Sequence, residues 1–399
     1  MIEDDVYRTS SQYRYWSYTK ESLARIRQNT NDLASERVRA AFRRVQASKS
    51  SSDSNNGDAS VGDAEVLTLT VDEELKIVEW GCQKIMDMGE AMSPRVPSAV
   101  VVCIFHFYPC PDILFLTSHA HVHKATAIQY LRRFYLTNSP MTYHPKQIMM
   151  CALYLATKAD HFYISLPRFI AELNNVSEDN VKAPEFLLLQ GLRFTLDVRH
   201  PMKGLAGGHV EMSDMAEGGL LKHIEPGKTG AKRIGAAADE AKKLLATAAQ
   251  LTDAYFLYTP SQIWLAAVMV ADQGLVISYI EAKLAGLQSL NADATAVDQL
   301  RQKLIATISS CAELLESYRS PEDDAAQRKE MKRIGKKLTV CQNPEKMDIV
   351  AVTRAKAAEK REGDNGSDAE KALKKRKFER ENLQKDGDVF GPDLRDVAR

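Results

Sequence analysis

Residues 145–159 read PKQIMMCALYLATKA and form the most informative segment of the chain. A helix over these residues is apolar around nearly its whole circumference, because Ile148, Met149, Leu153 and Leu155 point to different sides. Such a helix lies at the centre of a bundle unless it spans a membrane. Pro145 favours a helix start at this point, because the first turn tolerates proline. The segment therefore predicts a buried central helix with other helices around it.

The same pattern returns at a constant offset of 115 residues. LTN at 136–138 and YHPKQI at 143–148 match LTD at 251–253 and YTPSQI at 258–263. Alanines at 152 and 156 match those at 267 and 271, so no gap is needed. In both copies a proline opens an apolar helix. The sequence therefore predicts two related helical domains.

Further helical patterns surround both copies, and no segment alternates as a strand does. The first of these patterns, residues 7–46, predicts one helix or two. Thr70 and Glu73 form a capping box that starts another helix. The remaining helices are expected over 125–136, 165–173, 184–196, 236–258, 260–272, 278–287 and 294–318. The predicted fold class is all-α, with two tandem helical bundles and flanking helices.

Composition sets the expected boundaries. We expect an N-terminal helical extension over 1–46, a disordered Ser-rich linker over 47–65 and a first bundle over 66–198. The Gly-rich residues 199–235 are expected to join it to a second bundle over 236–318. Residues 319–399 are highly charged and are expected to form a solvated helix or tail. Residues 355–399 are expected to be dispensable for folding.

Charge and cysteine content exclude several classes of protein. The 399 residues contain 53 Lys+Arg and 53 Asp+Glu, so no net field attracts nucleic acid. Six scattered Cys indicate reduced thiols in an intracellular protein. The N-terminus MIEDDVYRTS is acidic and polar, which is untypical of a secretory signal. The apolar run 100–116 contains Pro109, Pro111 and Asp112, so no membrane contact is expected.

No motif for catalysis or metal binding stands out. GxxxxGK[ST], HExxH and nucleophile signatures are absent from the sequence. One cluster invites a zinc hypothesis, but its spacing fits no standard zinc pattern: Cys103, His106, Cys110, His119, His121 and His123. We therefore expect no catalytic residue, no cofactor and no metal.

Two segments resemble the cyclin family. LYLATKAD at 153–160 is similar to the first cyclin-box signature, in which a Lys closes the central helix, and PEFLLLQGLRFTLDV at 184–198 to the fifth helix of that box. SSQYRYW at 10–16, RRFYLTNSPMTYHP at 132–145 and LTDAYFLYTPSQI at 251–263 resemble the cyclin H branch. The resemblance runs discontinuously from Ser10 to about Tyr318. It implies two tandem cyclin boxes.

The resemblance also implies a function without catalysis. A cyclin binds and activates a cyclin-dependent kinase, and Lys158 and Glu185 match the pair that hydrogen-bonds kinase backbone near the mobile C-helix. An ionised donor and acceptor hold main-chain groups strongly. The alternative is that both residues only complement helix macrodipoles. His161 stands where many cyclins carry an acidic residue, and we do not expect it to be catalytic.

Partners and location follow from the cyclin H branch. Its members regulate the CDK-activating kinase within general transcription factor IIH (TFIIH), which implies a RING-finger assembly factor and the nucleus. Trp16 lies on a helix expected to pack near the kinase. Lys374, Lys375, Arg376 and Lys377 form a possible nuclear import signal or a solvated helical face. The alternatives are a cyclin of another transcriptional kinase, a DNA-binding core like general transcription factor B, and an enzyme with an unfamiliar site.

Residues 101–123, VVCIFHFYPCPDILFLTSHAHVH, differ from their surroundings. Cys, His, Phe and Pro crowd together and helical periodicity is lost. Excision of 101–123 gives PSAV-KATAIQYLRRFYL, and excision of 102–124 gives PSAVV-ATAIQYLRRFYL. Either junction restores the cyclin H pattern. We predict that the segment is translated intron. The alternative is an inserted surface loop, which chain entropy tolerates but which would expose an apolar patch.

Overall fold

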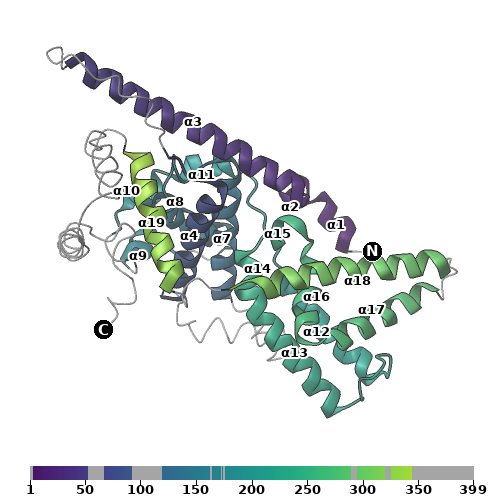
Figure 1. Cartoon of the computed structure of the whole chain (residues 1–399). Coiled ribbons are helices and arrows are strands. Elements are labelled where there is room, and N and C mark those ends of the chain that lie inside the picture. Colours follow the sequence, from purple (N-terminus) through teal and green to yellow (C-terminus); the bar gives the residue numbers. More distant parts are fainter. Residues whose placement is uncertain are drawn as a thin grey trace, which may run out of the picture. The chain divides into compact units, whose positions relative to one another are not determined.

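The computed structural model describes residues 3–52, 67–91, 119–161, 164–171, 173, 176–288, 294–319 and 325–343. Within these residues the regular elements are helices and no strand occurs, so the predicted all-α class is confirmed (Figure 1). The chain divides into two compact units. Unit 1 comprises Met1–Ile26, Glu79–Thr137 and Pro145–Ser320, and unit 2 comprises Arg27–Val78, Asn138–His144 and Pro321–Arg399. None of the helices described is long and apolar enough to cross a bilayer.

The first repeat in unit 1 is built around α8, Pro145–Ala159. This helix packs against α7 (His119–Thr137), α10 (Glu178–Lys182) and α11 (Glu185–Gly191). The short α9, Leu166–Ala171, lies between α8 and α10 in sequence. The residues of α8 that are buried come from all sides of the helix: Pro145, Ile148, Met149, Cys151, Ala152, Leu153, Leu155, Ala156 and Thr157. The predicted central helix is therefore present.

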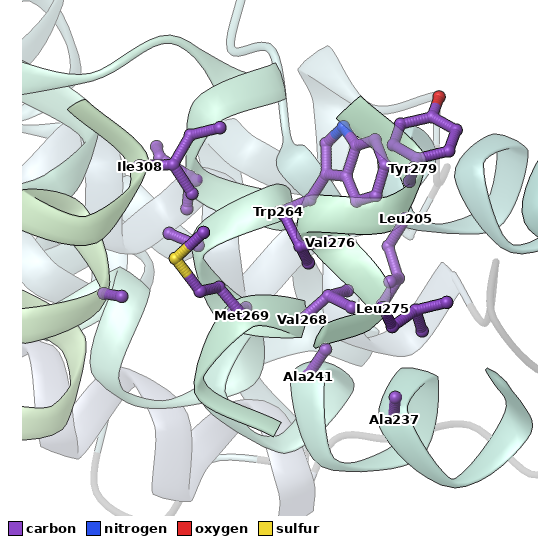
Figure 2. Close-up of a cluster of buried hydrophobic side chains, with 14 of the residues drawn as sticks. Leu205, Ala237, Ala241, Trp264, Val268, Met269, Leu275, Val276, Tyr279 and Ile308 are labelled. Carbon is purple, nitrogen blue, oxygen red and sulfur yellow. The ribbon is translucent and has the colours of Figure 1, made fainter. Parts of the chain in front are cut away.

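The second repeat is built in the same way around α16, Pro260–Ala271. Its neighbours are α12 (Pro201–Glu217), α13 (Lys228–Ala246), α17 (Gln273–Gln288) and α18 (Ala294–Ser317). Figure 2 shows Trp264, Val268 and Met269 of α16 among side chains of these helices. Thr259 and Gln262 form a capping box at its start. Two short helices, α14 (Ala248–Leu251) and α15 (Ala254–Leu257), precede it.

The prediction of a Gly-rich inter-domain region over 199–235 is wrong for most of these residues. Residues 201–217 form α12, which contributes Leu205, Met212 and other residues to the core of the second repeat. The glycines are present in this helix because Trp264 of α16 packs directly against it. A Cβ at Gly204 or Gly208 would lie 2.5 Å or 2.4 Å from the Trp264 indole, so only glycine lets the ring approach this helix. The second bundle therefore begins near residue 200 rather than 236.

Several predicted helix bounds also differ. The N-terminal extension forms α1 (Glu3–Thr9), α2 (Ser11–Trp16) and α3 (Lys20–Ser52), so α3 continues six residues into the range expected for the linker. The helix expected over 184–196 ends at Gly191. It ends there because Arg193 and Phe194 have positive φ angles of 52° and 55°, which no α-helix contains.

Unit 2 contains a helix inside the range expected to form a charged helix or tail, and the sequence did not predict that this helix is buried on one side. In this unit α19, Ala325–Gln342, joins residues of α3 and the start of α4 (Val71–Ala91) in one apolar core. The buried members are Ala34, Val38, Phe42, Leu69, Ile77, Met141, Ile334, Leu338 and Cys341. The Glu73 carboxylate, which completes the predicted capping box with Thr70, also accepts from Arg333 and Lys337 of α19 at 2.7 Å each. Part of the predicted tail is therefore a core helix.

Some predictions fall outside the described residues. These are residues 53–65 of the linker, 101–118 of the anomalous segment, the basic cluster 374–377 and the dispensable region 355–399. Residues 119–123 of the anomalous segment do fall inside, and they form the first turn of α7. Helical structure therefore begins before Lys124, within the segment predicted to be intron.

Candidate functional site

Lys158 and Glu185 lie together on the first repeat. Lys158 occupies the last turn of α8, where a cation is favoured, and Glu185 opens α11, where an anion is favoured. The Lys158 ammonium donates a hydrogen bond to Oε1 of Glu185. Their side chains are 40% and 30% exposed, so both retain access to solvent. The two residues predicted to act as a pair are therefore adjacent, and both helix ends point to the same place.

Aromatic side chains support the lysine. Its ammonium lies 5.0 Å from the centroid of the Tyr154 ring, one turn earlier on α8. Tyr154 in turn packs on Phe169 of α9, with ring centroids 5.0 Å apart. The quadrupole of an aromatic ring attracts a cation that lies over its face, and the attraction is stronger when the cation is desolvated. These contacts restrict the lysine to the surface near α11.

Two exposed aromatic rings lie next to the ion pair, and sequence reasoning missed them. Phe186 follows Glu185 directly, and Phe194 follows the end of α11; their rings pack edge to face with centroids 6.2 Å apart. Phe186 is 63% exposed and Phe194 is 61% exposed. The helical wheel offered a signal, because Phe186 falls opposite the buried Leu188. Exposed aromatic side chains are enriched at protein interfaces.

Trp16, the third predicted contact residue, is buried. It is 1% exposed and packs with Leu23, Leu136 and Phe256 in a separate apolar cluster of unit 1. The indole therefore offers no surface to a partner. The packing of its helix near a kinase stays a prediction, and Trp16 itself would take part in it only from a buried position.

The other polar candidates have structural explanations. His161 follows α8 with φ 59°, in the left-handed conformation that often ends a helix, and its N–H donates to the Lys158 carbonyl at 3.3 Å. Burial raises the pKa of the Cys82, Cys151 and Cys311 thiols to about 12, which makes them poor nucleophiles. Among the described residues, no three His, Cys, Asp or Glu side chains group as metal ligands. What remains is a surface that can bind main-chain groups and apolar side chains.

Comparison with known proteins gives a consistent group of relatives. The family model for the cyclin C-terminal domain matches residues 200–316, which is the second repeat including α12. The chain is 32% identical to cyclin Ccl1 of Saccharomyces cerevisiae, over 70% of this chain and 62% of that protein. It is 28% identical to cyclin mcs2 of Schizosaccharomyces pombe over 92% of this chain and 95% of that one. Cyclin-H of Xenopus laevis is 27% identical, with 66% and 68% covered.

Solved structures give the same result. A chain in the structure of the CAK complex of Chaetomium thermophilum bound to ATP-gamma-S aligns with a TM-score of 0.63 and 28% identity. The alignment covers 92% of this chain and 98% of that one. A chain of the yeast TFIIK (Kin28/Ccl1/Tfb3) complex aligns with a TM-score of 0.50 and 28% identity, covering 77% of this chain and 99% of that one. The similarity therefore extends over both repeats and the flanking helices.

Proposed function

The chain belongs to the cyclin family, with relatives in the cyclin H branch, and we propose that it binds and activates a cyclin-dependent kinase. The observation that carries this proposal is the exposed pair of Lys158 and Glu185 at two converging helix ends, with Phe186 and Phe194 beside it. The first repeat thus presents a donor, an acceptor and an apolar surface within one small area. This combination suits a partner that offers both main-chain groups and apolar side chains.

The pair has spare hydrogen-bonding capacity for a partner. The ammonium of Lys158 carries three N–H donors, and the Glu185 carboxylate offers about four lone-pair sites. Their bond to each other uses one donor and one acceptor site. In cyclins the matching residues bind kinase backbone near the C-helix. Fixing that helix places its Glu beside the ATP-binding Lys, which an active kinase requires.

The assembly in which the chain works is part of the proposal. The matched solved structures are a CAK complex and the TFIIK complex that contains Kin28, Ccl1 and Tfb3. We expect the chain to act within a comparable assembly, with a kinase and a RING-finger assembly factor, as part of TFIIH in the nucleus. We expect no catalysis by the chain alone, since cyclins act as regulatory subunits.

Affinity purification of the chain from its native cells tests the proposal. A cyclin-dependent kinase should be recovered and should be active only with the chain present. Lys158→Ala and Glu185→Ala should each weaken its binding, because truncating a buried interface charge costs about 2–5 kcal/mol. Lys182→Ala is the matched control, since its exposed ion pair with Glu178 lies on the neighbouring α10.

Folding and binding are separable in this experiment. The Lys158–Glu185 pair is partly exposed, so its loss should change the free energy of unfolding by no more than about 1 kcal/mol. The melting temperatures of the variants should therefore lie within about 4 °C of that of the wild type. Unchanged kinase recovery with the double variant would assign the contact to other residues. Recovery of no kinase at all would refute the proposed function.

A further inference from the structure

Phe194 combines an exposed ring with an unusual backbone. Its φ is 55° and that of Arg193 is 52°, so two consecutive non-glycine residues occupy the left-handed region. This conformation is unfavourable for a bulky side chain and persists only where the surroundings impose it. The N–H of Phe194 donates to the Leu189 carbonyl at 2.9 Å, and that of Arg193 to the Gln190 carbonyl at 2.9 Å. The turn places the Phe194 ring on the surface beside Phe186.

The N-terminal helix α2 holds both neighbours of Phe194. The indole Nε1–H of Trp16 donates to Oγ1 of Thr195 at 2.8 Å. On the other side, the Arg193 guanidinium lies 5.5 Å from the centroid of the Trp16 ring. Thr195 also donates to the Leu192 carbonyl at 2.7 Å, which closes the turn. One buried tryptophan therefore contacts the residues that precede and follow Phe194.

Trp16 is itself fixed by a buried arginine. The Arg133 guanidinium lies 5.2 Å from the centroid of its ring and donates to the Asp197 carbonyl at 3.1 Å and to Gln12 Oε1 at 3.3 Å. Gln12 Oε1 also accepts the N–H of Arg199 at 2.6 Å. Burial lowers the pKa of Arg133 to about 10, so the side chain remains a cation at neutral pH. Helix α2 is thus attached to residues 193–199 at several points.

We propose that Trp16 is a positioning residue: through Thr195 and Arg193 it fixes Phe194 in its exposed conformation and prepares the surface for the kinase. The proposal rests on the proposed function of that surface. In this proposal Trp16 acts on the surface indirectly, because its own side chain is buried. A surface already fixed in its binding conformation binds more tightly, since less freedom is lost on association.

A double-mutant cycle in the full-length chain tests this proposal. Trp16→Phe keeps an aromatic ring for both arginines but removes the N–H, and Phe194→Ala removes the ring that is positioned. Each should weaken binding of the kinase recovered in the affinity purification, Trp16→Phe by roughly ten-fold. In the Phe194→Ala background, Trp16→Phe should have almost no further effect. Independent, additive losses would overturn the proposal, as would unchanged binding for either single variant.

Conservative variants separate positioning from general damage. Thr195→Val removes the acceptor and should behave like Trp16→Phe, whereas Thr195→Ser keeps the oxygen and should bind as the wild type does. Tyr15→Ala changes an exposed residue of the same helix and should leave binding unchanged. A loss of binding for Tyr15→Ala equal to that for Trp16→Phe would point to direct contact by α2 and would overturn the proposal.

Hydrogen exchange of the free chain tests, without a kinase, whether Trp16 fixes the turn at Phe194. The amide of Phe194 should exchange faster in Trp16→Phe than in the wild type, because the turn loses an anchor while the rest of the repeat keeps its protection. Unchanged exchange would overturn this inference and leave the proposed function standing. Accelerated exchange together with recovery of no kinase would instead refute the proposed function.

Discussion

Arg132 of the first repeat binds Asp253 of the second, with Nη2 2.6 Å from Oδ1. Its Nη1 also donates to the Leu251 carbonyl at 2.6 Å, and its guanidinium lies 5.6 Å from the centroid of the Phe256 ring. Arg132 lies on α7 of the first repeat. Asp253 belongs to the LTD motif of the second repeat, so the first repeat binds the turn that precedes the central helix of the second. The two bundles of unit 1 are therefore joined by an ion pair with a buried arginine and a partly buried aspartate.

Loss of this pair should destabilise unit 1. Arg132→Met keeps the aliphatic stem but leaves the Leu251 carbonyl and a partly buried carboxylate without the guanidinium, which costs about 2 kcal/mol. The free energy of unfolding in urea measures the effect. Arg199→Met, which removes an exposed ion pair with Asp197, is the control and should change it by less than about 1 kcal/mol. Equal effects for both variants would contradict the prediction.

Three glycines of α12 should respond in opposite ways to alanine. Gly204→Ala and Gly208→Ala place a Cβ against the Trp264 indole and should lower the free energy of unfolding by about 1–3 kcal/mol. Gly207→Ala meets nothing within 4 Å and should raise it by about 0.5–1 kcal/mol, since alanine favours the helix. Thermal melts of the three variants decide this. A stabilising Gly204→Ala would show that α12 does not approach the indole closely.

Acid should destabilise unit 1 through His200. Its ring nitrogens lie 2.9 Å from Thr126 Oγ1 and 3.0 Å from the Tyr255 hydroxyl, and burial lowers its pKa to about 4. Between pH 6.5 and about 4 the unfolded chain therefore binds more protons at this residue than the folded chain does. The stability contributed by neutral His200 is complete above pH 6.5 and falls by a few kcal/mol as the pH drops through this window.

A variant isolates this contribution from that of the carboxylates. His200→Gln keeps hydrogen-bonding groups but does not titrate, so the difference in melting temperature between wild type and variant should shrink between pH 6.5 and 4. The carboxylates titrate in both proteins and cancel in the difference. A constant difference across this range would show that His200 is not a neutral buried group.

Two C-terminal truncations should behave differently. Removal of residues 344–399, which include 355–399, keeps α19 and should leave the free energy of unfolding unchanged. Removal of residues 325–399 takes Ile334 and Leu338 out of the core of unit 2 and should cost about 3–6 kcal/mol, because each buried side chain contributes about 1.5–3 kcal/mol. Urea unfolding measures both. Equal stability of the two truncations would mean that α19 is not part of this core.

Peptide mass spectrometry of the native protein decides whether residues 101–123 are present. Trypsin cleaves after Arg95 and Lys124, so the full segment appears in one long peptide, residues 96–124. If 101–123 are intron, the peptide is VPSAVK; if the boundary is one residue later, it is VPSAVVATAIQYLR. We expect one of the short forms. Detection of the long peptide would refute the prediction.

The central helices could be predicted because their pattern is local. A segment such as 145–159, apolar on every side, has no alternative to a bundle core, and the constant offset to 260–271 identified the second copy. Helix α12 could not be predicted in this way. Its glycines lower helix propensity, and their purpose appears only when the Trp264 indole lies against them.

The site was predictable only in part, for a similar reason. Lys158 and Glu185 lie 27 residues apart in the chain, and no local rule joins them; the family resemblance did. Phe194 could not be assigned because its exposure depends on a left-handed turn held by distant Trp16. In α19, the stripe of Ile334, Leu338 and Cys341 has helical spacing, but the surrounding charges suggested a solvated tail.

The core of unit 2 has a consequence for synthesis of the chain. Val38, Phe42, Ile77 and Met141 emerge early from the ribosome, while the α19 residues that complete their core lie about 200 residues beyond Met141. At 5–20 residues per second, about 10–40 s pass before α19 is made. During that time the nascent polypeptide cannot bury this apolar surface against its final neighbour. Translation speed and chaperone supply should therefore influence the yield of this protein more than they would influence the yield of a chain that contained the two repeats alone.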